Sequence, residues 1–194
     1  ELSGKEIGLV GYGSIGRELA GLCKAIGMKV AVYDPFVDGR AIEGEGHRCE
    51  KTLEGLLRNA DVVSLHVPLT DKTRNLVGER ELGLMKPSSV LINCARGGVI
   101  DERALADALG NGRIHSAGLD VFSSEPVAAD NRWASLDNVV ITPHMAGQTR
   151  EAAAGVSTMA AEGVLAVLSG ERWPHVANRA AYDHPRWKDR GPAR

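Results

Sequence analysis

Three glycines near the start of the chain constrain its fold more than any other feature. Gly11, Gly13 and Gly16 follow the short apolar run Ile7–Val10 and precede apolar residues that recur at helical spacing as far as Gly27. This order predicts a strand, a tight turn and a helix. Because a helix N-terminus offers unpaired N–H groups and partial positive charge, such a turn can hold a pyrophosphate.

An acidic residue after the next apolar run makes this interpretation more specific. A GxGxxG pattern alone is weak evidence, since it is more often a plain turn. Here Met28–Tyr33 predicts a second strand, and Asp34 follows it directly. A carboxylate at that position accepts hydrogen bonds from a ribose diol and repels a 2′-phosphate. The pattern therefore predicts a dinucleotide site that favours NAD over NADP, with nearby Arg40 as the one feature that could favour NADP.

Apolar runs alternate with helical patterns through the rest of residues 1–148. Further strands are predicted at 61–67, 90–93, 116–121 and 139–142, and Asp101 can cap a helix before the third of these. Strands that alternate with helices need right-handed crossovers. This predicts an α/β fold with a three-layer, doubly wound, mostly parallel sheet of the Rossmann class. In such sheets ligands bind at the carboxyl ends of the strands.

The pattern changes at Thr149. Apolar and small residues at three- and four-residue spacing predict one long amphipathic helix that ends near Gly170. They are Val156, Met159, Ala160, Gly163, Val164 and Val167. From Glu171 we expect a poorly structured tail. The chain is thus expected to have a nucleotide-binding domain at 1–148, and a long helix and tail at 149–194.

Composition narrows the class of protein. With 43% apolar residues and a formal net charge of −2, the chain has the composition of an ordinary globular domain. Lys and Arg are scattered, which predicts neither nucleic-acid binding nor attachment to a membrane surface. No stretch approaches the ~20 apolar residues of a membrane span, and we expect no signal peptide. With neither feature predicted, a cytoplasmic setting is the default expectation. Because Cys23, Cys49 and Cys94 are odd in number and widely spaced, we expect reduced thiols and no metal site.

Polar residues after the later predicted strands could carry chemistry at the same sheet edge. Arg96 offers a planar fork of donors for a carboxylate, although a surface arginine paired with an acid fits the local sequence equally well. His144 could give a proton to a carbonyl oxygen as hydride reaches the carbon. A carboxylate such as Glu125 would favour the imidazolium. A lone histidine more often caps or packs, so the acid/base interpretation depends on both residues sharing one edge.

Several segments together resemble the nucleotide-binding domain of the D-isomer-specific 2-hydroxyacid dehydrogenases. They are 10–16 (VGYGSIG), 66–70 (HVPLT), 85–87 (MKP), 93–98 (NCARGG), 118–126 (GLDVFSSEP) and 143–147 (PHMAG). The resemblance implies an oxidoreductase that transfers a hydride between NAD and a small D-2-hydroxy acid or 2-keto acid. It implies Arg96 as the substrate clamp, His144 as the acid/base and Glu125 as its partner. Formate dehydrogenases have a glutamine at the position of Glu125, so the glutamate favours a hydroxy acid.

The resemblance also implies the residues that line the NAD site, with Asp120 holding the nicotinamide carboxamide. The matching positions are Gly11, Gly13, Ser14, Ile15, Gly16, Asp34, Val67, Pro68, Thr73, Cys94, Ala95, Arg96, Asp120, His144 and Gly147. Since nucleotide domains of this family form the subunit interface, the resemblance implies a homodimer. A small carboxylated substrate is the other expected partner.

One departure from the family pattern affects the expected activity. In the family, most of a substrate domain precedes the nucleotide domain, whereas this sequence begins at Glu1. We therefore expect part of a dehydrogenase, whose long helix would return to a substrate domain missing from this chain and whose cleft would admit water. Two alternatives remain open, namely an NAD(H)-binding sensor or corepressor-like module without turnover, and a unit that mainly dimerises.

Overall fold

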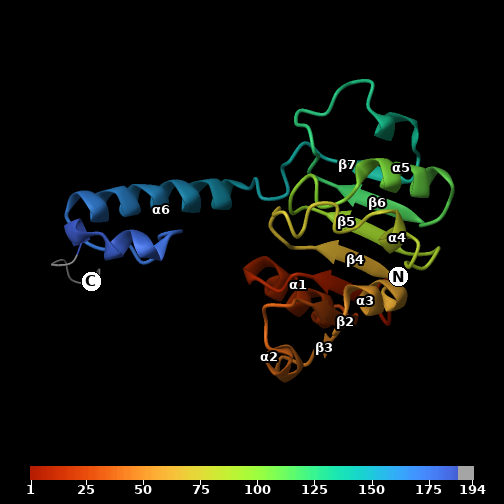
Figure 1. The fold of residues 1–194 in the computed structure, drawn as a ribbon, viewed down its shortest axis with the longest axis horizontal. Helices are drawn as coiled ribbons and strands as arrows, with labels where there is room; N and C mark the ends of the chain where they lie inside the picture. Colours follow the sequence, from red (N-terminus) through yellow and green to blue (C-terminus); the bar gives the residue numbers. More distant parts are fainter. Residues whose placement is uncertain (188–194) are drawn as a thin grey trace. The chain divides into compact units, whose positions relative to one another are not determined.

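The computed structural model describes residues 1–187, which form two compact units, Glu1–Ala146 and a second unit that begins at Gly147. The first unit contains a sheet of seven strands in the order β3-β2-β1-β4-β5-β6-β7 (Figure 1). Each neighbouring pair of these strands is parallel. Because the strand order reverses at β1, the sheet is doubly wound. The predicted Rossmann class is confirmed.

The bounds of the elements are as follows. The strands are β1 (Glu6–Val10), β2 (Lys29–Tyr33), β3 (Arg48–Cys49), β4 (Val62–Leu65), β5 (Val90–Asn93), β6 (Ser116–Leu119) and β7 (Val139–Ile141). The α-helices are α1 (Ser14–Ala25), α2 (Gly39–Gly44), α3 (Leu53–Asn59), α4 (Glu79–Leu82), α5 (Glu102–Gly110) and α6 (Arg150–Leu168). The described residues also form the 3-10 helices η1 (Arg132–Ser135), η2 (Arg179–Asp183) and η3 (Pro185–Trp187).

All six predicted strands are present, and β4 and β6 each end two residues earlier than predicted. Their last paired residues, Leu65 and Leu119, lie in register with Asn93 of β5 and Ile141 of β7. Four strands therefore end in line and form a common carboxyl edge. The sequence did not predict β3, α2, α3 and α4, because elements of two to seven residues are too short for a clear periodic pattern.

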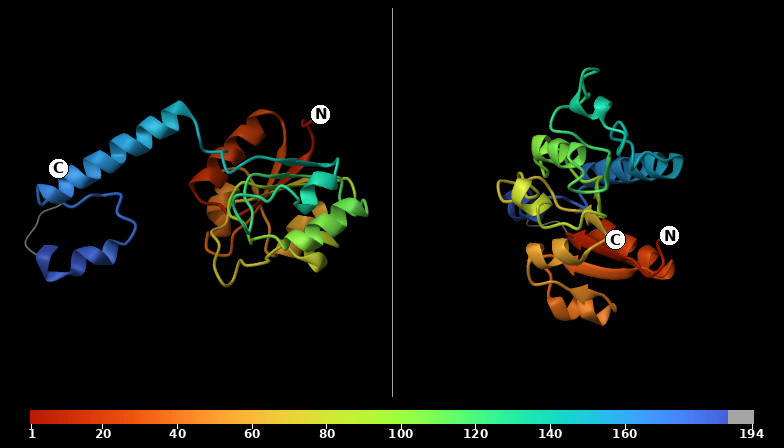
Figure 2. Two further views of the ribbon diagram at one scale, coloured as in Figure 1. Left: turned by 90° about the horizontal axis from the view of Figure 1, so that it is seen from above. Right: turned by 90° about the vertical axis from the view of Figure 1, so that its right-hand side faces the viewer.

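The central strands are buried on both faces. In β1, Ile7 and Leu9 pack into one apolar cluster with Ala20 of α1, whereas Val10 belongs to a second cluster with Leu56 of α3. Successive side chains of a strand point to opposite faces, so the continuous apolar run of β1 reflects a helix layer on each side. Figure 2 shows α1 and α5 on opposite sides of the sheet.

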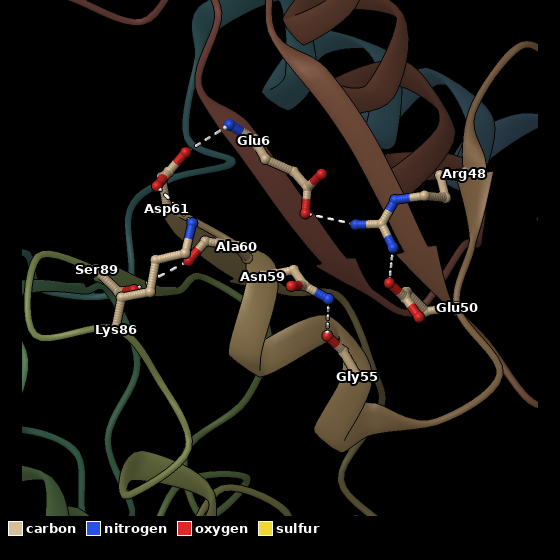
Figure 3. Close-up of polar contacts among 9 residues, drawn as sticks. All are labelled: Glu6, Arg48, Glu50, Gly55, Asn59, Ala60, Asp61, Lys86 and Ser89. Carbon is tan, nitrogen blue, oxygen red and sulfur yellow. Dashed lines mark hydrogen bonds and ion pairs between the residues drawn. The ribbon is translucent and has the colours of Figure 1, made fainter.

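Charged side chains join the strands near the edge where β1 and β4 begin (Figure 3). Asp61 accepts hydrogen bonds from the backbone N–H of Glu6 and the ammonium of Lys86, both at 2.8 Å. These two donors hold the pKa of Asp61 below its usual value. Arg48 pairs with Glu6 and with Glu50. Because these charges pair with one another, we assign this group a structural role. The candidate ligand-binding residues lie at the opposite, carboxyl edge of the sheet.

Helix α6 of the second unit has the predicted position but a different surface. Thr149 caps it by accepting the N–H of Ala152 at 3.0 Å, and the helix ends at Leu168. Leu165 and Leu168 lie outside the predicted stripe and are also exposed. The helix is therefore apolar on several sides, and the predicted amphipathic pattern is wrong in this respect.

The length and mean hydropathy of α6 would also permit it to cross a membrane. This corrects the expectation that no run of the sequence is apolar enough. The criterion concerns length and composition only, and a helix that packs on a protein surface can meet it as well.

The segment after α6 is more ordered than predicted. The hydroxyl of Tyr182 accepts the N–H of Trp173 at 2.7 Å and donates to its carbonyl oxygen at 2.9 Å. Arg172 donates to the carbonyl oxygen of Trp187 at 2.6 Å, and the rings of Tyr182 and Trp187 meet edge to face. Trp173 in turn packs against Gly163 of α6. The expectation of a poorly structured tail is wrong for residues 171–187, and residues 188–194 lie outside the described part.

The contact between β1 and α3 predicts an effect on stability. A Cβ at Gly8 would lie 2.4 Å from a methyl carbon of Leu56 and 3.0 Å from the Cβ of Ala60. Both neighbours are fully buried, so they have little room to move. We expect Gly8→Ala to lower the free energy of unfolding by about 1–3 kcal/mol, measured by urea denaturation.

Gly21→Ala is the matched control. Gly21 lies within α1, and no atom lies within 4 Å of its added Cβ. Alanine favours a helix by about 1 kcal/mol over glycine, so we expect this variant to be more stable than wild type. Equal stability of the two variants would contradict the packing argument.

Candidate active site

The glycine turn lies between β1 and α1 at the carboxyl edge. Gly11 has φ +97°, and a Cβ there would come within 2.7 Å of the carbonyl oxygen of His66. A Cβ at Gly16 would lie 2.6 Å from the oxygen of Gly11, whereas no atom lies within 4 Å of one at Gly13. Gly11 and Gly16 therefore permit close packing, and Gly13 leaves open space where no side chain caps α1. This arrangement fits a pyrophosphate.

A cavity of about 340 Å³ lies beside this turn. It brings together residues from the ends of β1, β4 and β5 that the sequence predicts as cofactor-binding. Its lining residues are Gly13, Ser14, Ile15, Gly16, His66, Val67, Pro68, Cys94, Ala95 and Arg96. Thr73 is not among them. Its hydroxyl donates to the carbonyl oxygen of Pro68 at 2.6 Å and accepts the N–H of Thr70 at 2.7 Å, so it shapes the loop beside the cavity.

Asp34 is fixed at the end of β2, next to the glycine turn. One of its oxygens accepts the N–H of Tyr12 at 2.7 Å, and the other accepts the N–H of Phe36 at 2.9 Å. The carboxylate is partly exposed, so it can still accept a ribose hydroxyl. Arg40 is exposed, and its backbone N–H contributes to the cap of α2.

Glu125 and His144 form a hydrogen-bonded pair at the same edge. The distance from Oε2 of Glu125 to Nδ1 of His144 is 2.8 Å, and Oε1 accepts the N–H of Phe122 at 2.8 Å. The bond with His144, followed by the bond from Phe122, lowers the pKa of Glu125. Both side chains line a second cavity of about 290 Å³. The carboxylate therefore stays ionised beside the imidazole.

Asp120 holds the loop that carries His144. It is 2% exposed, and its oxygens accept the hydroxyl of Thr142 at 2.5 Å and the N–H groups of Met145 and Ala146 at 2.8 and 2.9 Å. Burial acts to raise the pKa of Asp120, but the hydrogen bonds from Thr142, Ala146 and Met145 outweigh it, and the pKa is lowered. The implied contact of Asp120 with a carboxamide stays a prediction.

Hydrogen bonds from the buried side chain of Asn93 hold the loop that carries Arg96. Asn93 donates to the carbonyl oxygen of Arg96 and accepts the N–H of Ala95, both at 3.0 Å. The guanidinium of Arg96 donates to the oxygen of Ala95 at 2.5 Å. Within residues 1–187 it pairs with no carboxylate, so the alternative of a surface arginine paired with an acid has no support there.

Two further contacts join the Arg96 loop to the Glu125 loop. A Cβ at Gly97 would lie 1.9 Å from the carbonyl oxygen of Phe122, so only glycine fits between them. Glu102 of α5 accepts both the N–H and the hydroxyl of Ser123, at 2.5 and 2.7 Å. Sequence reasoning missed the roles of Asn93, Gly97 and Glu102. All three lie in or near matched motifs, but their partners are distant in sequence or set by loop geometry.

With this geometry in place, comparison with known proteins is decisive. Residues 1–146 match the family described as D-isomer specific 2-hydroxyacid dehydrogenase, NAD binding domain. The chain belongs to this family. NAD is therefore the cofactor of the 2-hydroxyacid dehydrogenase domain, and the glycine turn, Asp34 and the 340 Å³ cavity offer the features that it needs.

Two curated relatives illustrate the similarity. D-3-phosphoglycerate dehydrogenase of Methanocaldococcus jannaschii is 43% identical over 92% of this chain and 34% of its own length. Glyoxylate reductase of Aeropyrum pernix is 43% identical over 92% of this chain and 53% of its own length. The chain thus spans between a third and about half of these relatives.

A solved structure shows the same fold with the cofactor named. The D-lactate dehydrogenase with NAD+ from Lactobacillus jensenii is similar with a TM-score of 0.82 and 33% identity, over 90% of this chain and 56% of that chain. Gly147, the last predicted cofactor residue, belongs to the second unit, and its contact with the cofactor stays a prediction.

The hydrogen bonds of Asp120 predict a pH-dependent contribution to stability. In Asp120→Asn an amide N–H₂ would face N–H donors, so we expect a loss of about 1–3 kcal/mol at pH 7. The folded pKa of Asp120 lies below its unfolded value of about 3.9. Its contribution is therefore present above that pH and is lost as the pH falls through the folded pKa. The difference between variant and wild type should shrink below pH ~4, measured by denaturation at several pH values.

Asp71→Asn provides the control for this measurement. Asp71 is exposed, and its side chain has no hydrogen bond or ion pair within the described residues. We expect its stability to follow that of wild type at every pH. A loss for Asp120→Asn that did not change between pH 7 and pH 3 would disagree with the charge-based explanation.

Proposed function

We propose that this 2-hydroxyacid dehydrogenase domain serves the transfer of a hydride between NAD and a small D-2-hydroxy acid or 2-keto acid. The observation that carries the proposal is the 2.8 Å bond between Glu125 and His144 at the sheet edge that also carries the glycine turn. When bound, NAD supplies or accepts the hydride. The chain's own residues must then supply a proton for the substrate's carbonyl oxygen and a hydrogen-bonding partner for the substrate's carboxylate.

His144 meets the first requirement. Its Nδ1 faces Glu125, so the proton for the substrate oxygen would come from Nε2 on the other side of the ring. The ionised Glu125 stabilises the protonated imidazole and fixes its orientation. The positive φ of His144, +52°, and the hydrogen bonds of Asp120 set the direction in which this ring leaves the loop.

Arg96 meets the second requirement. Its guanidinium is exposed beside the cavity and pairs with no acid in the described part of the chain. A planar fork of donors matches the two oxygens of a substrate carboxylate. The names of the relatives, D-3-phosphoglycerate dehydrogenase and glyoxylate reductase, support a small carboxylated substrate.

We further propose that residues 1–148 act as the NAD-binding half of an enzyme, and that 149–194 join it to a substrate domain. The limited share of each relative that the chain spans supports this division. So do the exposed apolar residues of α6, which include Val156, Leu165 and Leu168. A homodimer and a cytoplasmic location belong to the same proposal.

Grafting tests the proposed function. We would replace the matching residues of the Aeropyrum pernix glyoxylate reductase by this chain and follow NADH absorbance with glyoxylate. We expect reduction, because Arg96, Glu125 and His144 are brought in together. His144→Gln should lower kcat by about 10²–10⁴-fold, and Arg96→Lys should mainly raise KM, since lysine keeps the charge but loses the fork.

The unmodified reductase and the 194-residue chain alone are the controls. We expect the chain alone to quench or enhance NADH fluorescence on binding, with little turnover, because water enters its cleft. A graft that binds NADH but reduces no 2-keto acid would contradict the dehydrogenase proposal and favour the sensor alternative.

The position of Asp34 predicts a preference between cofactors. The carboxylate repels a 2′-phosphate, so wild type should bind NADH more tightly than NADPH. Asp34→Asn removes the charge. We therefore expect the dissociation constant for NADPH divided by that for NADH to fall about tenfold. Fluorescence titration measures both constants. Asp71→Asn, which removes an exposed carboxylate elsewhere, should leave the ratio unchanged, and an unchanged ratio for Asp34→Asn would refute the prediction.

A further inference from the structure

His66 lines the NAD cavity but has no role so far. It follows β4 directly, and its backbone N–H donates to the carbonyl oxygen of Val10 at 2.7 Å. Its own carbonyl lies against Gly11, where no Cβ would fit. The backbone of His66 is thus held beside the glycine turn, and His66 forms part of the cavity wall with Gly13 and Arg96.

A buried serine determines how this imidazole is held. The distance from Oγ of Ser64 to Nε2 of His66 is 3.0 Å. Ser64 is 4% exposed, and its hydroxyl has no other hydrogen-bond partner within residues 1–187. A buried hydroxyl that leaves its hydrogen unpaired costs free energy. The hydroxyl therefore donates to Nε2, which must be unprotonated, and the ring hydrogen of the neutral imidazole lies on Nδ1.

The charge state of the ring agrees with this assignment. Burial lowers the pKa of His66, so the imidazole is neutral near pH 7. A neutral ring with its hydrogen on Nδ1 is a hydrogen-bond donor without a net charge. The neighbouring lining residues Val67, Pro68 and Ile15 have apolar side chains. His66 is thus one of four lining residues whose side chains can donate a hydrogen bond, with Ser14, Cys94 and Arg96.

We propose that His66 is a cofactor-binding residue, whose Nδ1–H donates a hydrogen bond to an oxygen of the ribose–pyrophosphate part of NAD. Ser64 acts behind it as a positioning residue, because it selects the tautomer that presents this donor. The inference rests on the NAD binding that the proposed function requires, and not on hydride transfer.

Two amide substitutions separate this role from a packing role. Asparagine places an N–H near the position of Nδ1, whereas glutamine reaches the position of Nε2. We would titrate the purified 194-residue chain and its variants with NADH by fluorescence. His66→Gln should raise Kd about tenfold, and His66→Asn should stay within about threefold of wild type. Ser64→Ala keeps the ring but frees its tautomer, so its Kd should lie between these two.

Competition by ADP and by ADP-ribose locates the acceptor oxygen. A loss of affinity in His66→Gln for both competitors places the acceptor in the ADP part of NAD, on the pyrophosphate or the adenosine ribose, and a loss for ADP-ribose alone indicates the second ribose. Either result supports the proposal. Wild-type affinity for NADH in His66→Gln, or an equal loss in both amide variants, would overturn it. If wild type itself did not bind NADH, the proposed function would fail together with this inference.

A second measurement needs no substitution. Long-range ¹⁵N–¹H correlation spectra distinguish the two neutral imidazole tautomers, and a through-bond assignment identifies His66. We expect the form with hydrogen on Nδ1 in the wild-type chain at pH 7. The form with hydrogen on Nε2 would overturn the inference even where a variant failed to fold.

Discussion

The site depends on the close approach of backbone segments at the carboxyl edge of the sheet. At Gly11 the turn after β1 lies against the carbonyl group of His66, and at Gly97 the loop after β5 lies against the carbonyl group of Phe122. Neither position has room for a Cβ. Because these contacts involve backbone atoms, no change of side-chain rotamer could make room for a Cβ at either position. Arg96, Glu125 and the cavity wall derive their relative positions from them.

A buried hydrogen-bond acceptor, Asp120, fixes a further loop at this edge. Asp120 follows β6, and its two oxygens hold Thr142, Met145 and Ala146 around His144. Burying a carboxylate is costly unless hydrogen bonds satisfy it, so the loop must close around Asp120 to offset that cost. The orientation of His144 is therefore linked to the folding of the sheet edge itself. Glu125 then needs only one short bond to fix the remaining freedom of the ring.

Local patterns predicted the parts of this architecture that local chemistry determines. The glycine turn, Asp34 and six of the strands follow from spacing and polarity. The family motifs point to Arg96, Glu125 and His144, which follow the neighbouring strands β5, β6 and β7. The two-residue strand β3 leaves no periodic signal. The aromatic contacts of Trp173 and Tyr182, like the serine behind His66, depend on distances in space that one sequence does not encode at short range. For this reason the sequence alone did not predict the ordered segment after α6 or the bond between Ser64 and His66.

Binding of NAD and transfer of hydride place different demands on the chain. The glycine turn, the uncapped start of α1 and the cavity wall, which suit a bound dinucleotide, all lie within the first unit. Transfer also needs a site from which water is excluded. The side chain of His144 is 51% exposed, and an imidazole in contact with water can exchange its proton with solvent instead of a substrate. In the proposed transfer, the Glu125–His144 pair would therefore need a second surface to cover it, so NAD binding and turnover would be separable properties of this domain.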